Sequence, residues 1–227
     1  MHAHDIVHHV SAESCVTLLD TMGNDARVVN AARVSFARWV DESKALDDKD
    51  KKLISYLAEH EHDSPFFHPV VCFRIKMPIF VAREWYRHTV GFARNEVSRR
   101  YVDTGVECFV PACIRARDIK VKQGSLPTPV VNDELSKHIM RSSMNFAVSA
   151  YRMILAQGAA PEVARMVLPV AMFTEFIETA SLAAYARLYS LRHSPDAQLE
   201  IREYATIVGQ LLANKFPVAW HALTNNA

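Results

Sequence analysis

The spacing of apolar residues switches between a helical and a strand period along this chain, and the two periods do not alternate regularly. Residues 47–60 place acidic side chains first and then Leu53, Ile54 and Leu57 on one side, which is the pattern of an amphipathic helix. Residues 70–76 alternate and are rich in β-branched side chains, as expected of a strand. A parallel α/β fold needs a repeated strand–helix–strand order, which this chain lacks. The sequence therefore predicts an α+β fold.

Capping and breaking residues place further elements. Proline is tolerated in the first turn of a helix, so Pro78 and Pro161 each indicate a helix start. Asn132 is expected to cap a long helix that stops at Gly158. The other expected elements are a strand and turn at residues 7–19, a short strand near 108–110 within a loop at 105–129, a strand at 172–179, and a last helix capped by residues 194–196.

The balance of charge weighs against one broad class of function. The 227 residues include 26 basic and 25 acidic side chains, whereas a protein that coats nucleic acid usually has a strong basic excess. The four cysteines form no Cys-x-x-Cys pair, and the first residues lack a signal-peptide pattern. No apolar run approaches the ~18 residues that a membrane span needs. These features predict a cytoplasmic protein with small-molecule partners, without a membrane partner, and argue against nucleic acid as its ligand.

The standard phosphate-binding loops are absent from the sequence. There is no Gly-x-Gly-x-x-Gly after a strand and no Gly-x-x-x-x-Gly-Lys. A dinucleotide would therefore have to be held by side chains, and in part by neighbouring subunits.

The densest polar stretch runs from residue 83 to residue 101. Arg83 and Arg87 are one helical turn apart and share a face. The planar guanidinium of arginine binds phosphates and carboxylates through paired hydrogen bonds, and the Asn, Glu and Ser side chains nearby suit a base or a flavin edge. A solvated helix end followed by a charged loop has the same composition. Composition alone leaves both interpretations open.

One motif inside this stretch is more specific than its composition. Arg87-His88-Thr89 is followed, after a spacer, by Asn95-Glu96-Val97-Ser98-Arg99-Arg100-Tyr101. Further blocks come in order along most of the chain, namely MGNDARVVNAARVSF, HEHDSPFFHPVVCFRIKMPIFVAREWYRH, PEVARMVLP and LR…AQLEI. Together they resemble the flavin-dependent thymidylate synthases, whose motif reads Arg-His-Arg, a short spacer and Asn-Glu-x-Ser-x-Arg-Tyr.

The resemblance implies a reaction and an assembly. It implies that FAD takes a hydride from NADPH, that methylenetetrahydrofolate gives a one-carbon unit to C5 of dUMP, and that dTMP is formed. It also implies one domain over residues 1–227, with a central, largely antiparallel sheet flanked by helices, in a homotetramer whose sites lie at subunit contacts.

Matching by motif also implies the residues of the site. Those around the nucleotide would be Glu84, Arg87, Glu96, Val97, Ser98, Arg99, Arg100, Arg165 and Arg192. Those around the flavin would be Ser64, Arg87, His88, Thr89, Val90, Asn95, Glu96, Ser181 and Arg187. The catalytic candidates are Arg192, His62 and Ser98, of which Arg192 would stabilise negative charge on the pyrimidine ring. No metal is expected, because the spacing of His60, His62 and His68 matches no common zinc pattern.

Several positions depart from the family pattern, mainly on the flavin side. Thr89 replaces the third residue of Arg-His-Arg and the spacer is one residue longer, so Arg94 is a candidate to restore the lost charge. The other departures are Glu84 for a glutamine, Phe67 for a glutamate, and Ser181 and Arg187 for asparagines.

Two alternatives remain at the level of the sequence. The same scaffold could methylate or hydroxymethylate another pyrimidine nucleotide, dCMP or UMP. A non-catalytic nucleotide- or RNA-binding protein could use the same basic cluster.

Overall fold

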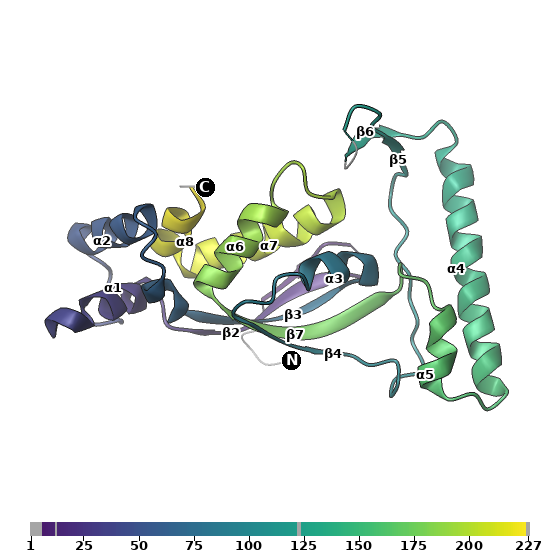
Figure 1. Ribbon diagram of the computed structural model, residues 1–227, viewed down its shortest axis with the longest axis horizontal. Helices are drawn as coiled ribbons and strands as arrows, with labels where there is room; N and C mark the ends of the chain where they lie inside the picture. Colours follow the sequence, from purple (N-terminus) through teal and green to yellow (C-terminus); the bar gives the residue numbers. More distant parts are fainter. Residues whose placement is uncertain (1–5, 12, 122–123, 226–227) are drawn as a thin grey trace. The chain divides into compact units, whose positions relative to one another are not determined.

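The computed structural model describes the chain except residues 1–5, 12, 122–123 and 226–227. The described residues form a main sheet that is mostly antiparallel, with strand order β1-β2-β3-β7-β4 (Figure 1). These strands are β1 (Ile6–His9), β2 (Cys15–Met22), β3 (Val70–Pro78), β7 (Phe173–Ser181) and β4 (Phe92–Glu96). The first two form a hairpin in which Ile6 lies opposite Leu18 and His9 opposite Cys15. The predicted α+β class with a largely antiparallel sheet and flanking helices is confirmed.

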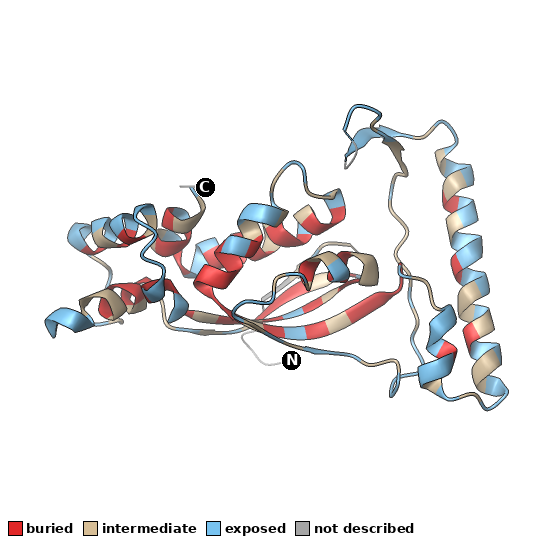
Figure 2. Cartoon of the chain, viewed as in Figure 1, coloured by how far each residue is buried: buried red, intermediate tan, exposed pale blue. Residues whose placement is uncertain are grey.

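The core lies against the middle strands of this sheet (Figure 2). Along β3, Val71, Phe73, Ile75 and Met77 alternate and have no exposed surface, because every second side chain of a strand points to the same face. The ring of Phe73 packs edge-on against that of Tyr185, with 5.3 Å between centroids. The strand predicted from residues 70–76 is confirmed.

Contacts within the chain divide it into two compact units. The first comprises Met1–Ile75, Trp85–Asn95 and Ile177–Ala227, and the second comprises Lys76–Glu84 and Glu96–Phe176. Strands β3, β4 and β7 and helix α3 (Ile79–Trp85) each contribute residues to both units. The prediction of one family-type domain over 1–227 stays a prediction.

The first unit contains most of the helices. They are α1 (Asp25–Arg33), α2 (Asp48–Glu59), α6 (Leu182–Arg192), α7 (Leu199–Lys215) and α8 (Pro217–Thr224), with the 3₁₀ turns η1 (Val34–Phe36) and η2 (Ser64–Phe67). Helix α8 begins at the Asp25 carboxylate, which accepts hydrogen bonds from the backbone N–H groups of Val218 and Ala219. Helix α7 meets α6 at Gly209, where a Cβ atom would lie 2.4 Å from Cε2 of Tyr189. This close packing requires glycine.

The second unit is built on one long helix and a small hairpin. Its elements are β5 (Arg115–Arg117), β6 (Ser125–Pro129), α4 (Asp133–Ala156), α5 (Pro161–Ala164) and the 3₁₀ turn η3 (Arg165–Val167). Only Lys137, Met144 and Tyr151 are buried on α4, and their spacing of seven residues gives a single narrow stripe. Among the helices of the described chain, α4 included, none combines the length and apolar character that crossing a bilayer demands.

Two local predictions are wrong, and a third is confirmed only in position. Residues 194–196 do not cap the last long helix: α7 begins at Leu199, and Ser194 instead accepts a hydrogen bond from the Asp196 backbone within a turn. The segment 108–110 forms only an isolated bridge between Cys108 and Met172. Asn132 stands at the N-cap of α4, but its side chain makes no capping hydrogen bond.

Candidate active site

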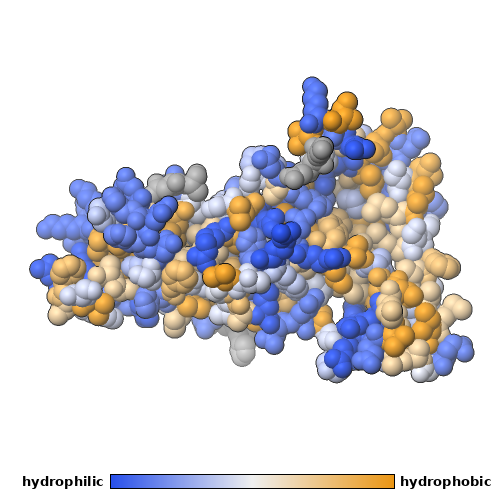
Figure 3. Space-filling view, in the orientation of Figure 1, coloured by the Kyte–Doolittle hydropathy of each residue, from blue (hydrophilic) through white to orange (hydrophobic). Residues whose placement is uncertain are grey.

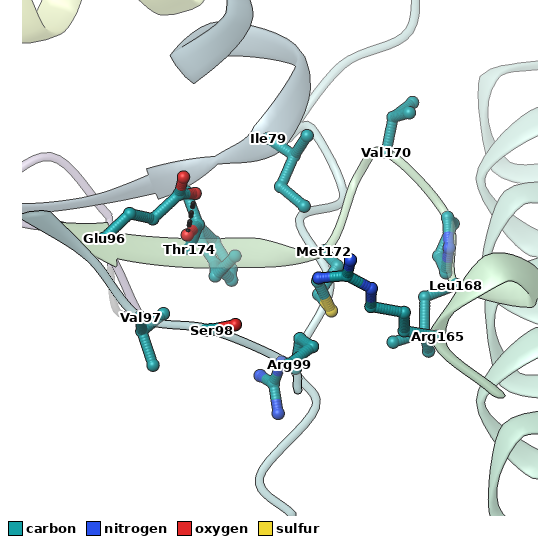
Figure 4. A pocket seen from close by; sticks show the side chains of 12 residues that line it. Ile79, Glu96, Val97, Ser98, Arg99, Arg165, Leu168, Val170, Met172 and Thr174 are labelled. Carbon is teal, nitrogen blue, oxygen red and sulfur yellow. Dashed lines mark hydrogen bonds between the residues drawn. The ribbon is translucent and has the colours of Figure 1, made fainter. Parts of the chain in front are cut away.

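A pocket of about 390 Å³ opens in the second unit, beside the start of β7 (Figure 4). Its polar lining consists of Glu96, Ser98, Arg99, Arg165 and Thr174. Its apolar lining consists of Ile79, Val97, Leu168, Pro169, Val170, Met172 and Phe173. Two guanidinium groups beside an apolar wall provide the two kinds of surface that a nucleotide needs, since phosphate is anionic and a base has flat apolar faces.

Glu96 is fixed at the end of β4 by two bonds to β7. The hydroxyl of Thr174 donates to Oε1 of Glu96 at 2.5 Å, and the backbone N–H of Val97 donates to the carbonyl of Glu175 at 2.9 Å. The carboxylate is therefore held in one orientation inside the pocket. Thr174 was not among the predicted site residues, because nothing in the sequence distinguishes it from any threonine in a buried strand.

The two arginines of the pocket are held differently. Arg99 donates from its guanidinium to the carbonyls of Thr104 at 2.5 Å and Gly105 at 3.2 Å, so it closes the loop that follows the motif. Arg165 lies at the start of η3 and extends its guanidinium into the pocket (Figure 4). Arg165 is thus placed to bind an anion, while Arg99 also shapes the rim.

Arg100 is directed elsewhere. Its Nε lies 3.3 Å from Oε2 of Glu162, and its guanidinium lies over the ring of Tyr101. It does not belong to the lining of the pocket.

A cationic cluster in the first unit surrounds His88. Nε of Arg192 donates to Nε2 of His88 at 2.9 Å, so this imidazole nitrogen carries no proton. Burial, and after it the positive charges of Arg192, Arg94, Arg187 and Arg87, together lower the pKa of His88 to about 4. The cluster therefore contains a neutral imidazole among guanidinium groups at neutral pH.

The turn after His88 brings three of the predicted flavin-side residues together. Gly91 has φ +82°, and a Cβ atom there would lie 3.3 Å from Cβ of Ala184 and within 4 Å of Ser181 and Arg187. Arg187 donates to the carbonyl of Val90 at 3.3 Å. The Ser181 hydroxyl accepts from the backbone N–H of Ala184 and so caps α6.

Arg187 also explains one departure from the family pattern. Its guanidinium lies over the ring of Phe67, 5.4 Å from the centroid. The face of an aromatic ring attracts a cation, so Phe67 contacts a positive group although it has no carboxylate.

Arg94 does not supply a spare positive charge, and the idea that it replaces the missing arginine of the motif needs correction. Its guanidinium forms an ion pair with the fully buried carboxylate of Glu178 and donates to the backbone carbonyl of His88 at 2.5 Å. Its charge is balanced inside the protein.

Comparison with known proteins identifies the relatives of this chain. A family model described as thymidylate synthase complementing protein matches residues 17–218. A flavin-dependent thymidylate synthase of Thermus thermophilus is 39% identical over 207 residues, which cover 91% of this chain and 74% of that protein. Another from Thermosipho africanus is 37% identical over 209 residues, covering 90% and 88%. The chain belongs to the flavin-dependent thymidylate synthase family.

Solved structures agree with this membership. The chain is similar to the UMP/dUMP methylase PolB from Streptomyces cacaoi bound with 5-Br dUMP, with a TM-score of 0.81 and 31% identity, covering 92% of this chain and 94% of that chain. The same methylase bound with 5-Br UMP gives a TM-score of 0.82 and 28% identity, covering 95% and 96%. The curated relatives are named for flavin-dependent thymidylate synthesis and the solved relative for methylation of UMP and dUMP, so both support methylation of a pyrimidine nucleotide as the general reaction.

The site residues predicted from the family resemblance are divided between the two units. The nucleotide-side residues in the second unit are Glu84, Glu96, Val97, Ser98, Arg99, Arg100 and Arg165. The flavin-side residues in the first unit are Ser64, Arg87, His88, Thr89, Val90, Asn95, Ser181 and Arg187. Two residues, Arg87 and Glu96, are predicted for both the nucleotide and the flavin. Arg87 belongs to the first unit, as does Arg192, and Glu96 belongs to the second.

The structure brings together only part of each set. Glu96, Val97, Ser98, Arg99 and Arg165 line one pocket, whereas Glu84, Arg87, Arg100 and Arg192 are not in its lining. On the flavin side, His62 and Ser64 are exposed beyond the end of α2, and the His62 ring lies edge-on to Tyr56 at 6.1 Å. Thr89 and Asn95 are exposed as well.

Membership in the family implies FAD, with methylenetetrahydrofolate and NADPH as co-substrates. The first unit offers features that fit such a group. The Gly91 turn lies against Ser181 and Arg187, and the guanidinium groups around His88 match the negative charge of a pyrophosphate. The cationic cluster and the Gly91 turn are therefore the part of this chain that suits a flavin dinucleotide.

Proposed function

We propose that this protein is an FAD-dependent thymidylate synthase. In the overall reaction, dUMP, methylenetetrahydrofolate, NADPH and a proton give dTMP, tetrahydrofolate and NADP⁺. The observation that carries the proposal is the pocket that Arg165 and Arg99 line together with an apolar wall and the Glu96–Thr174 pair. The structure of a relative with a bromo-dUMP ligand supports the same substrate class.

Each side chain has a role that its surroundings support. Arg165 binds the phosphate through a charge-assisted pair of hydrogen bonds. Arg192, oriented by His88, stabilises the negative charge that develops on the pyrimidine when C5 becomes nucleophilic. Ser98 lies in the pocket wall, where its hydroxyl can hydrogen-bond the nucleotide.

The residues of the first unit hold the cofactor. His88, Arg187, Ser181 and the backbone at Gly91 would bind FAD, which when bound passes reducing equivalents from NADPH to the transferred carbon. His88 remains neutral and accepts a hydrogen bond, so it orients Arg192 and does not act as an acid at neutral pH.

The proposal includes assembly into a homotetramer with sites at subunit contacts. Large apolar side chains are exposed along α4, namely Leu135, Ile139, Phe146 and Met153 (Figure 3). Apolar surface of this kind favours association with further copies. Light scattering should report a species of about four times the chain mass of 25.6 kDa, and a fully active monomer would contradict the assembly.

A second substrate is supported by one specific observation. The similar methylase from Streptomyces cacaoi has been solved with 5-Br UMP as well as 5-Br dUMP. Product analysis with dUMP, UMP and dCMP, each with methylenetetrahydrofolate, NADPH and FAD, should give methylated dUMP as the main product. Preferential methylation of UMP or dCMP would show that the protein carries out the family reaction on a different nucleotide. A hydroxymethyl product would show that the transferred carbon is not reduced to a methyl group.

A further inference from the structure

A fully buried carboxylate lies at the base of the cationic cluster. Glu178 on β7 has no exposed surface, and its two oxygens accept from Nε1 of Trp85 at 3.1 and 3.2 Å. Nε of Arg94 donates to the same carboxylate. A buried charge of this kind is tolerated when it is paired and hydrogen-bonded, and here Arg94 is the pairing cation.

The rest of the Arg94 guanidinium faces the cluster. Its Nη1 donates to the backbone carbonyl of His88 at 2.5 Å, and its plane lies over the rings of Phe92 at 4.5 Å and Tyr86 at 5.4 Å. The side chain is only 14% exposed. A guanidinium has the rigid fork needed to bind a carboxylate on one side and a carbonyl on the other, which an ammonium group lacks.

These bonds form one continuous chain from the core to the predicted catalytic arginine. Glu178 holds Arg94, Arg94 holds the His88 backbone, and the His88 ring accepts from Nε of Arg192. We propose that Arg94 is a positioning residue for the reaction, which sets the place of His88 and through it the direction of the Arg192 guanidinium. The inference rests on the proposed function, because that function assigns Arg192 to the pyrimidine.

Arg94 belongs to the spacer between His88 and Asn95. Arg94 lies on β4, one residue before Asn95, and its guanidinium reaches Glu178 on the neighbouring strand β7. Its charge is balanced by Glu178, and its second bond supports the His88 backbone from the core side.

The chain offers a matched control for the loss of a partly buried ion pair. Arg33 on α1 lies 2.5 Å from Asp50 on α2, and the Asp50 side chain is 7% exposed. Arg33→Lys should lower stability and leave turnover unchanged.

The test compares Arg94→Lys with this control in the FAD-loaded protein. Lysine keeps the charge and can still pair with Glu178, but it cannot reach the His88 carbonyl at the same time. We expect kcat for the pyrimidine nucleotide to fall on the order of a hundredfold, since small displacements of a positioned group have effects of that size, with little change in KM. The rate of FAD reduction by NADPH should stay close to that of the wild-type protein.

A second readout does not depend on turnover. Between pH 5 and 8 the His88 imidazole of the wild-type protein should stay neutral in an NMR titration, with its signal assigned by His88→Gln. In Arg94→Lys the net charge is preserved, so titration of His88 within this range would report that the ring has left its buried place. If Arg94→Lys fails to fold, Arg94→Gln combined with Glu178→Gln removes both buried charges, and the same readouts apply.

The outcomes separate the possible roles. Wild-type kcat and an untitrated His88 in Arg94→Lys would overturn the proposal and leave Arg94 as a structural ion pair. Weakened FAD binding with normal kcat at saturating FAD would also overturn it, because Arg94 would then be a flavin ligand. Absence of turnover in the wild-type protein would contradict the proposed function, while the His88 titration would still test the positioning.

Discussion

Nε of Arg192 donates a hydrogen bond of 2.9 Å to Nε2 of His88. The two residues are separated by more than a hundred positions, and each belongs to a different sequence block of the family pattern. The bond requires that His88 be neutral, and burial among arginines favours that state by lowering the pKa to about 4. The arginines that keep His88 neutral therefore also help to orient Arg192.

Replacement of Arg192 tests its role in the chemical step. If its guanidinium stabilises charge on the pyrimidine, Arg192→Ala should lower turnover on the order of a hundredfold or more, with the fold intact. Arg192→Lys should restore little, since an ammonium group cannot reproduce the planar fork. Reduction of FAD by NADPH needs no pyrimidine charge and serves as the internal control in stopped-flow measurements. Near wild-type turnover in Arg192→Ala would refute the assigned role.

Replacement of Arg165 should have a different kinetic signature. A phosphate contact is present in the ground state and the transition state alike, so Arg165→Ala should raise KM for the nucleotide and change kcat little. Steady-state kinetics with varied dUMP measures both. A large fall in kcat at saturating nucleotide would show that Arg165 takes part in more than binding.

Thr174 is expected to matter through Glu96. Thr174→Val keeps the shape of the side chain and removes the donor to the Glu96 carboxylate, a bond to a charged group that contributes about 1.5–3 kcal/mol. We expect KM for the nucleotide to rise at least about tenfold, which corresponds to the lower end of that range. Thr179→Val on the same strand is the matched control and should behave as wild type. Equal kinetics of the two variants would show that Glu96 takes no part in binding the nucleotide.

Stability should depend on pH through His88. The pKa is about 4 in the folded protein and about 6.5 for an ordinary histidine, so the unfolded chain binds a proton in this interval that the folded chain does not. The contribution of neutral His88 is therefore fully present above pH 6.5 and is lost as the pH falls towards 4. Urea unfolding at pH 7 and pH 5 should show a smaller loss of stability in His88→Gln than in wild type. His60→Gln, at an exposed position, is the control, and equal losses in wild type and His88→Gln would contradict the shift.

Gly209 should be sensitive to any side chain. A Cβ atom at 2.4 Å from the Tyr189 ring must displace that ring, which is itself stacked on His193 and packed edge-on to Trp220. Overpacking of this kind costs about 1–3 kcal/mol, although alanine favours a helix. Thermal unfolding of Gly209→Ala should show a lowered Tm, and an unchanged or raised Tm would mean that α6 and α7 pack less closely.

The sequence predicts the central elements because their signals are local. The alternation in residues 70–76, the acidic start of residues 47–60 and the stop at Gly158 are signals carried by adjacent residues, and β3, α2 and α4 lie close to the expected positions. Strand β4 was not anticipated, because its residues are largely polar and exposed and it is a strand only through its place beside β7. Such pairing is tertiary information.

The arrangement of the site also depends on contacts that the sequence does not reveal. The motif gives the residue types around the nucleotide, but it does not reveal that Arg100 pairs with Glu162 or that Arg94 pairs with Glu178. Nor does it single out Thr174, whose role depends on one hydrogen bond across the sheet. These partners are distant in sequence, so only the folded chain brings them together.

The most direct test follows a labelled carbon. The protein is incubated with dUMP, NADPH, FAD and methylenetetrahydrofolate carrying a ¹³C-methylene group, and the nucleotides are analysed by mass spectrometry. The account predicts dTMP with the label in its methyl group, and loss of this product when either FAD or NADPH is omitted. Protein that binds FAD and dUMP yet forms no labelled methylated nucleotide would contradict it.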